Sequence, residues 1–208
     1  MVLKFTYFTT RGLGEPIRLL LVDNKIPFED DRILWANWAE LKPKMIFGQI
    51  PCLLSDGTEI AQTAAILHHL ARVYGLNGRT EQETTFIDMF YEGVRDLHSK
   101  YANMIYNDYE NGKETFIRDV LPGELKLLEK LLKTHSNGEK FVAGENVSFV
   151  DYVLFEELDV ELILDAKCLD KFPVLKKFHE RFGERPNIKK YIAKRNTMNV
   201  NVNGNGKQ

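Results

Sequence analysis

The sequence predicts two consecutive domains, a small α/β domain followed by a larger all-α domain. The first observation is that residues 3–72 follow the order strand, helix, strand and then strand, strand, helix. The second is the tetrapeptide at 75–78 (GLNG), which interrupts this pattern as a linker would. The third is that apolar residues beyond it recur at helical spacing. A length of 208 residues leaves room for one large domain or two small ones.

The α/β domain is predicted to begin with a strand at residues 3–8 (LKFTYF). Gly12, Gly14 and Pro16 then indicate a loop that leads into a helix, because proline suits the first helical turn. Residues 28–33 (FEDDRI) are interpreted as a second strand.

A hairpin and a helix are predicted to complete this domain. The stretch with Trp35 and Trp38 is interpreted as irregular. Residues 52–54 and 59–61 are two short strand-like segments, and the turn residues Ser-Asp-Gly separate them. The sequence AAILHHLAR at 64–72 is typical of a helix.

The second domain is predicted to be helical throughout. Ser148 and Asp151 have the spacing of a capping box, so a helix is expected to start there and to continue to about Leu164. That helix is apolar on more than one face, which indicates a buried central position. The polar tail at 199–208 (NVNVNGNGKQ) is expected to be flexible. Apolar residues at helical spacing predict the other helices: Phe86, Phe90, Val94, Leu97, Tyr101 and Met104; Leu125, Leu128 and Leu132; Val174, Leu175, Phe178 and Phe182; Ile188, Tyr191 and Ile192.

Composition excludes several classes of protein. A chain with 44% hydrophobic and 28% charged residues is typical of a globular fold rather than a disordered one. The net charge of -2 gives no overall attraction to nucleic acid or to an anionic membrane, and no apolar run is long enough to span a bilayer. The N-terminus lacks the pattern of a secretory signal. Cys52 and Cys168 form neither a CxxC pair nor a metal cluster, which favours a reducing compartment and predicts no metal site.

Seven segments stand out along the chain: Thr6-Tyr7-Phe8, Arg11-Gly12, Phe47 to Pro51, Gln62-Thr63, residues 87–101 (IDMFYEGVRDLHSKY), Val147 to Tyr152 and Asn203 to Gln208. In this order and spacing they resemble the cytosolic glutathione transferases. The similarity is closest to the pi class, and within it to nematode members, and it covers nearly the whole chain. It implies a thioredoxin-like domain at 1–76, a linker at 77–81 and a helical domain at 82–208 that contributes the electrophile pocket. It also implies a cytoplasmic homodimer.

The resemblance implies that Tyr7 points its hydroxyl at the glutathione sulfur. A free thiol has a pKa of about 8.5, and only its thiolate is a strong nucleophile. Lowering that pKa by two units requires about 2.7 kcal/mol. One hydrogen bond to a charged acceptor contributes about 1.5–3 kcal/mol, so a single well-placed hydroxyl is nearly sufficient. Without the resemblance, Tyr7 is interpreted as an ordinary aromatic strand residue.

The remaining glutathione contacts follow from the same resemblance. Trp38 and Lys42 are expected to hold the glycyl carboxylate. Ile50, in the motif Gln49-Ile50-Pro51 with a cis proline, would pair its backbone with the cysteinyl part of the tripeptide. Gln62 and Thr63 are expected to hold the γ-glutamyl end, with Thr63 at a helix N-terminus that favours an anion. From the residues alone, Lys42 is equally a surface lysine, Trp38 a core residue and Thr63 a plain N-cap.

Other roles involve the second substrate and the partner subunit. Asp96 is expected to accept from the glutathione ammonium of the partner subunit, and Phe47 to insert into the partner as a dimer contact. Phe8, Thr10 and Tyr106 match positions that line the pocket for hydrophobic electrophiles. Alternatively, Asp96 is a solvated surface acid, Phe47 a core residue and Tyr106 a wall residue.

One position departs from the family pattern. Many pi-class proteins have an arginine directly after Arg11-Gly12, where this chain has Leu13. The change removes a positive charge near the expected thiolate. The predicted function is a glutathione transferase that conjugates the glutathione thiolate to small hydrophobic electrophiles and needs no cofactor. One alternative is a ligandin-like carrier of hydrophobic compounds with little turnover. The other is a thiol oxidoreductase, which requires a cysteine in place of Tyr7 or a CxxC pair, and this sequence has neither.

Overall fold

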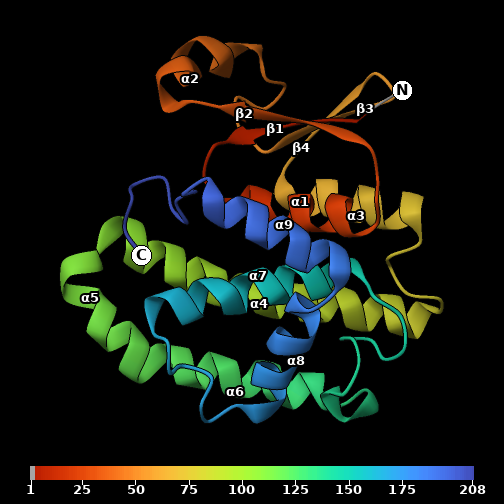
Figure 1. The fold of residues 1–208 in the computed structure, drawn as a ribbon, viewed down its shortest axis with the longest axis vertical. Coiled ribbons are helices and arrows are strands. Elements are labelled where there is room, and N and C mark those ends of the chain that lie inside the picture. The colour runs from red at the N-terminus through yellow and green to blue at the C-terminus, as the bar shows by residue number, and fades with distance from the viewer. Residues whose placement is uncertain (1–2) are drawn as a thin grey trace. The chain divides into compact units, whose positions relative to one another are not determined.

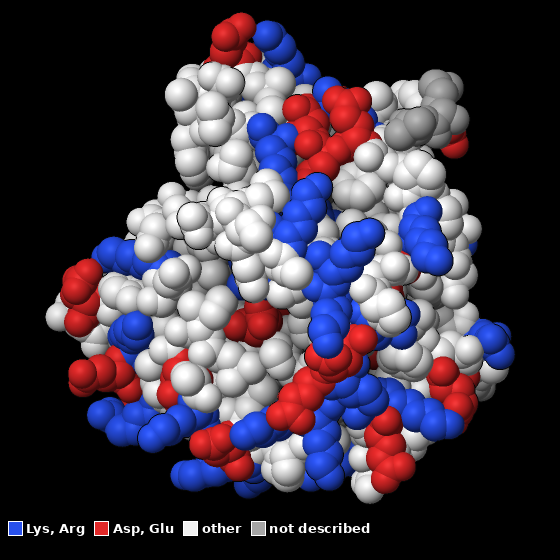
Figure 2. Space-filling view, in the orientation of Figure 1, with Lys and Arg blue, Asp and Glu red and all other residues white. Residues whose placement is uncertain are grey.

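The structure, a computed structural model, describes residues 3–208 (Figure 1). The chain forms two compact units. The first comprises the residues up to Tyr74 together with Arg185–Gly206, and the second comprises Gly75–Glu184 with Lys207–Gln208. Over the face in Figure 2, acidic and basic side chains lie interspersed, in keeping with a net charge of -2. In the described part of the chain, no helix is both long enough and apolar enough to cross a membrane.

A mixed four-stranded sheet forms the centre of the first unit, in the order β2-β1-β3-β4. β1 pairs in parallel with β2 and antiparallel with β3, and β3 pairs antiparallel with β4. Tyr7 lies opposite Arg32 in this register, near the carboxyl end of β1. The strands are β1 Leu3–Phe8, β2 Phe28–Ile33, β3 Cys52–Ser55 and β4 Thr58–Ala61.

Helices cover both faces of this sheet. In Figure 1, α1, α3 and α9 lie on one face and α2 on the other. The core of the unit consists of fully buried side chains from the sheet and the helices. Among them are Phe5 and Leu53 of the sheet and Ile17, Leu20 and Leu67 of the helices. The helices are α1 Glu15–Asp23, α2 Trp35–Leu41, α3 Thr63–Tyr74 and α9 Pro186–Thr197.

The second unit is a bundle of helices around α7. The Ser148 capping box is present: Asp151 accepts from the backbone N–H of Ser148 at 2.8 Å and also from the N–H of Val142 at 2.8 Å. Nearly every residue of α7 is buried, as its all-round apolar sequence predicts. The helices are α4 Glu81–Asn107, α5 Tyr109–Thr115, α6 Leu121–Leu132, α7 Phe149–Leu164 and α8 Pro173–Gly183.

The predicted fold, an α/β domain with a mixed sheet followed by helices, is confirmed. The prediction was wrong for the stretch with Trp35 and Trp38, which forms α2, and α5 was not predicted. The tail was also expected to be flexible, yet Val202 and Asn203 are only 4% and 5% exposed. The domain limits at 76 and 82 stay a prediction, and α9 packs with the first compact unit.

Candidate active site

Tyr7 is held by the loop that follows β1. Its side chain is 8% exposed, and its phenolic oxygen accepts a hydrogen bond from the backbone N–H of Leu13 at 3.1 Å. A phenol oxygen can accept one bond while it donates another, so this contact holds the oxygen in place and is compatible with donation of the phenolic proton to a ligand. Partial positive charge from the N–H also polarises the O–H and strengthens it as a donor.

Two glycines allow the loop to pack on the Tyr7 ring. A Cβ atom at Gly14 would lie 2.4 Å from Cδ1 of Tyr7, and one at Gly12 would lie 2.7 Å from its phenolic oxygen. Gly12 also has a φ of +41°, a conformation that disfavours residues with a side chain. Glycine is therefore required at both positions by close contact with Tyr7, and at Gly12 also by the backbone conformation.

A cavity of about 420 Å³ lies in the first unit, beside this loop. It contains seven of the nine residues predicted to bind glutathione, brought together from α2, the segment before β3 and the start of α3. Tyr7 itself is not among the lining residues, although Phe8 and Leu13 next to it are. The lining consists of Phe8, Leu13, Trp38, Lys42, Gly48, Gln49, Ile50, Pro51, Gln62 and Thr63.

The lining contains little charge. Lys42 is the only charged residue among the described residues that line the cavity. Its side chain is exposed, and Trp38 beside it on α2 is half-buried. A carboxylate of a ligand would therefore have one exposed lysine as its cationic partner in this cavity.

The segment before β3 brings backbone groups to the cavity. The Ile50–Pro51 peptide bond is cis, as the resemblance implies. Cys52 is the first residue of β3 to pair with the sheet, opposite Thr6 and Ala61. Ile50 lies two residues before it, beyond the paired ladder, so its N–H and C=O remain available to a ligand.

Gln62 is held in a strained conformation at the entrance to α3. Its φ is +73°, which costs a residue with a side chain on the order of 1 kcal/mol. Its amide nitrogen donates to Oε1 of Gln49 at 2.8 Å, and its carbonyl accepts from Ile66 in the first helical turn. The N–H groups of residues 63–65, which precede that bond, have no carbonyl partner within the helix. These N–H groups form the N-terminal end of α3, where the partial positive charge of the helix dipole attracts an anion.

Aromatic side chains extend from Tyr7 toward α2. The ring of Phe8 stacks on Trp35 with 3.9 Å between centroids and contacts the edge of Trp38 at 5.5 Å. Trp35, whose exposed fraction is 55%, also lies against Gly204 of the tail. The sequence analysis missed Trp35 because a tryptophan in a stretch without periodicity gives no signal of a stacked pair.

The other predicted residues lie elsewhere. Thr10 is 7% exposed and does not line the cavity; its carbonyl accepts from Arg18. Phe47 is 64% exposed, which makes its interpretation as a core residue of its own subunit wrong. Asp96 and Tyr106 lie on the surface of α4 in the second unit, and their part in the site stays a prediction. Gly48 and Leu13 line the cavity but were not predicted as binding residues.

The two cysteines remain protonated at neutral pH. Burial and a hydrogen bond to Glu59 at 3.2 Å raise the pKa of Cys52 to about 12. Burial and the charges of Glu161 and Asp165 raise the pKa of Cys168 to about 12. A thiol oxidoreductase needs a cysteine with a lowered pKa, so this chemistry counts against that alternative. Among the described residues, no group of His, Cys, Asp and Glu is arranged to hold a metal ion.

Comparison with known proteins gives matches along the chain. The N-terminal domain of glutathione S-transferases matches residues 3–72, and the C-terminal domain of the same family matches residues 95–195. Glutathione S-transferase P of Caenorhabditis elegans is 63% identical over 208 residues, with 100% of both chains covered. Glutathione S-transferase P of Homo sapiens is 37% identical over 204 residues, with 97% of both covered.

The fold gives the same relationship. The solved structure of a pi-class glutathione S-transferase from Onchocerca volvulus matches with a TM-score of 0.98 and 56% identity, covering 100% of both chains. The resemblance inferred from the sequence is confirmed by these findings. The chain therefore belongs to the glutathione S-transferase family and is a glutathione transferase, an enzyme that transfers alkyl or aryl groups to the glutathione thiol.

Proposed function

We propose that Tyr7 activates glutathione by donating its phenolic hydrogen bond to the thiolate sulfur. The observation that carries this is the Leu13 N–H bond to the phenolic oxygen, because it fixes the hydroxyl at the end of β1 beside the cavity. A hydrogen bond to a charged acceptor contributes about 1.5–3 kcal/mol, which is equivalent to a thiol pKa lowered by about one to two units. The thiolate then attacks the electrophilic carbon, and the leaving group departs or the adduct is protonated.

The tripeptide is proposed to bind in the cavity of about 420 Å³, which falls within the usual range for small-molecule sites. Lys42 and Trp38 hold its glycyl carboxylate. The backbone of Ile50 pairs with the cysteinyl unit in the manner of an added strand, with Gln49 and Pro51 beside it. Gln62 and Thr63 hold the γ-glutamyl carboxylate, because the N–H groups at the start of α3 favour an anion.

The electrophile is proposed to be small and hydrophobic. Phe8, Thr10 and Tyr106 are assigned to its pocket, and Tyr106 additionally donates to a developing oxyanion or leaving group. Leu13 adds apolar surface where an arginine would add charge, which favours neutral over anionic electrophiles. The curated relatives are named as transferases, which supports turnover rather than the ligandin-like carrier.

The active form is proposed to be a homodimer in the cytoplasm that uses no cofactor besides its co-substrate. Asp96 reaches the γ-glutamyl ammonium of the partner subunit. Phe47 supports this proposal, because a phenylalanine that is 64% exposed gains free energy by insertion into a second copy. Glutathione-affinity capture followed by native mass measurement tests binding and assembly together, and a captured monomer would contradict the dimer.

Replacement of Tyr7 by phenylalanine tests the catalytic assignment. The variant should still bind glutathione, but the pH at which the rate of conjugation rises should move upward by about one to two units, since the thiolate loses its donor. Tyr74→Phe is the matched control, because Tyr74 is an exposed tyrosine at the end of α3. An unchanged pH profile in Tyr7→Phe would remove this residue from its role.

A further inference from the structure

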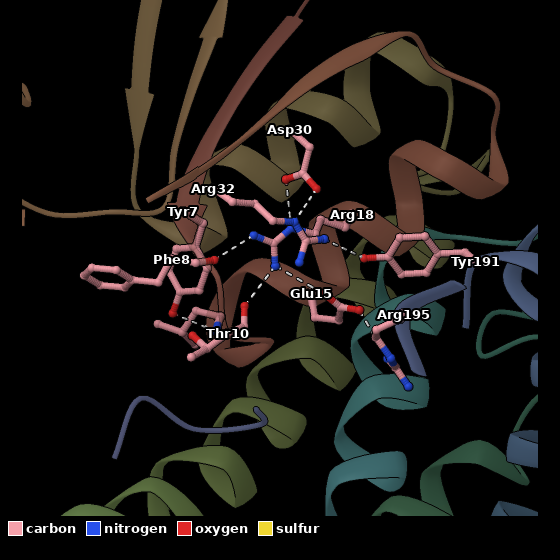
Figure 3. Close-up of polar contacts among 10 residues, drawn as sticks. Tyr7, Phe8, Thr10, Glu15, Arg18, Asp30, Arg32, Tyr191 and Arg195 are labelled. Carbon is pink, nitrogen blue, oxygen red and sulfur yellow. Dashed lines mark hydrogen bonds and ion pairs between the residues drawn. The ribbon is translucent and has the colours of Figure 1, made fainter. Parts of the chain in front are cut away.

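Residues Phe8–Gly14 are called the Tyr7 loop. Arg18 lies at the centre of a cluster of polar contacts next to this loop (Figure 3). Its side chain is fully buried. It donates to the carbonyl of Phe8 at 2.9 Å and to the carbonyl of Thr10 at 3.0 Å. These carbonyls flank the first residue after β1, so Arg18 fixes the path by which the chain leaves Tyr7. The guanidinium carbon also lies 5.7 Å from the centre of the Tyr7 ring.

The position of Arg18 depends on the carboxylates around it. A buried guanidinium is tolerated only where acids compensate its charge. Nη1 of Arg18 lies 3.2 Å from Oε2 of Glu15, and Nε lies 3.0 Å from Oδ1 of Asp30. Glu15 has the larger influence on geometry, because it is fully buried while the side chain of Asp30 is 27% exposed.

Glu15 is in turn held by the C-terminal helix. Its second oxygen, Oε1, lies 3.2 Å from Nη1 of Arg195 on α9, and the Arg195 side chain is 6% exposed. One carboxylate thus joins two arginines, one on α1 and one that follows it by 177 positions in the sequence. Figure 3 shows Arg195 and Glu15 on the side of the cluster opposite Phe8.

The chain after α9 contacts the same loop a second time. The backbone N–H of Arg11 donates to the carbonyl of Asn201 at 2.9 Å, and that of Gly12 donates to the carbonyl of Val202 at 3.0 Å. Arg11 is 3% and Val202 4% exposed, so each bond has one partner in a buried residue. Residues 195–202 therefore hold the loop in two ways. Arg195 acts through the ion pairs of Glu15 and Arg18, and the carbonyls at 201 and 202 accept backbone hydrogen bonds from the loop.

We propose that this C-terminal segment, residues 195–202, positions the Tyr7 loop for catalysis, and that Arg195 is a positioning residue acting through Glu15 and Arg18. The inference rests on the proposed role of Tyr7. It assigns a kinetic function to residues that are not among those lining the cavity. If Arg195 is lost, the Glu15 carboxylate relaxes toward Arg18, the carbonyls of Phe8 and Thr10 shift with it, and the hydroxyl of Tyr7 loses its alignment.

The alternative is that Arg195 only attaches α9 to α1. Arg185, at the start of α9, provides a matched control for this alternative, because its side chain also attaches α9 to α1. Its Nε donates to Oδ2 of Asp23 at 2.8 Å, at the far end of α1 from Glu15. Arg185→Met therefore removes a comparable tether without touching the Tyr7 loop.

The experiment compares Arg195→Met, Arg195→Lys and Arg185→Met in the full-length protein. For each, the ultraviolet absorbance of bound glutathione thiolate is titrated against pH, and kcat and KM for glutathione are measured, with thermal unfolding alongside. Arg195→Met should raise the midpoint of thiolate formation by about half a pH unit or more and lower kcat several-fold, with KM nearly unchanged. Arg195→Lys should fall between Arg195→Met and the wild type. Arg185→Met should lower the unfolding temperature but keep the wild-type midpoint.

Three results would overturn the proposal. The first is a wild-type midpoint in a folded Arg195→Met. The second is an equal shift in Arg185→Met, which would show that any loosening of α9 suffices. The third applies if Arg195→Met does not fold, in which case Arg195→Lys becomes the test. A wild-type midpoint of thiolate formation in Arg195→Lys would then overturn the proposal. A normal profile in Tyr7→Phe would instead defeat the proposed function itself, so the two failures are distinguishable.

Discussion

Replacing Gly14 by alanine tests how closely the Tyr7 loop must pack on the catalytic ring. The new methyl carbon would lie 2.4 Å from Cδ1 and 2.7 Å from Cγ of Tyr7, which are ring atoms of a buried side chain and cannot rotate aside. Ordinary carbon contacts begin at about 3.5 Å, so the ring or the loop must move by roughly 1 Å.

The expected effect on stability and activity follows from that displacement. Overpacking of this kind costs about 1–3 kcal/mol of unfolding free energy. A displacement of about 1 Å at a catalytic group costs roughly 10²-fold in rate, so kcat should fall much more than the affinity for glutathione. Thermal unfolding, glutathione binding and steady-state kinetics measure the three quantities separately.

Gly123→Ala is the matched control for this variant. Gly123 lies inside α6, and a Cβ there meets nothing within 4 Å. Alanine is preferred over glycine within a helix by about 0.5–1 kcal/mol, so this variant should be slightly more stable and fully active. The packing argument fails if Gly14→Ala keeps wild-type kcat and unfolding temperature.

Three further predictions concern other parts of the molecule. Lys42→Met should raise KM for glutathione about 5–10-fold with kcat nearly unchanged, because an exposed lysine contributes uniform binding, and a kinetic series shows whether kcat falls instead. Asp151→Ala should destabilise the protein by about 2–4 kcal/mol, since it leaves the buried N–H groups of Val142 and Ser148 unpaired; a denaturant titration measures this. Burial and the neighbouring charge of Glu157 raise the pKa of Glu161, so its contribution to stability is present below about pH 4.5 and is lost as pH rises. Glu161→Gln should therefore unfold at a higher temperature than the wild type at pH 8 but not at pH 4, and equal curves at both would refute it.

Much of the fold could be predicted because local signals agree with the tertiary structure. The capping box at Ser148 and Asp151 marks the start of α7, and its uniformly apolar sequence reflects burial on all sides. β1 and the loop of Gly12 and Gly14 are likewise signalled by alternation and by turn residues. In each case, the information lies within a few residues of the element.

The features that could not be predicted depend on distant contacts. α2 lacks apolar periodicity, and its Trp35 packs against Gly204, which follows it by 169 positions in the sequence. Arg195 looks like an ordinary basic residue at a helix end, and only the fold brings it to Glu15. The positive φ of Gln62 gives no signal in the sequence, because glutamine has no preference for that conformation.

The cysteine environments matter for an enzyme whose second substrates are electrophiles that react with thiolate sulfur. Cys52 follows the cavity residue Pro51 directly, yet both it and Cys168 carry a proton until about pH 12. Electrophiles react with the anion rather than with the neutral SH group. Alkylation of these two cysteines by the enzyme's own electrophiles is therefore disfavoured at neutral pH, and glutathione is the thiol that reacts.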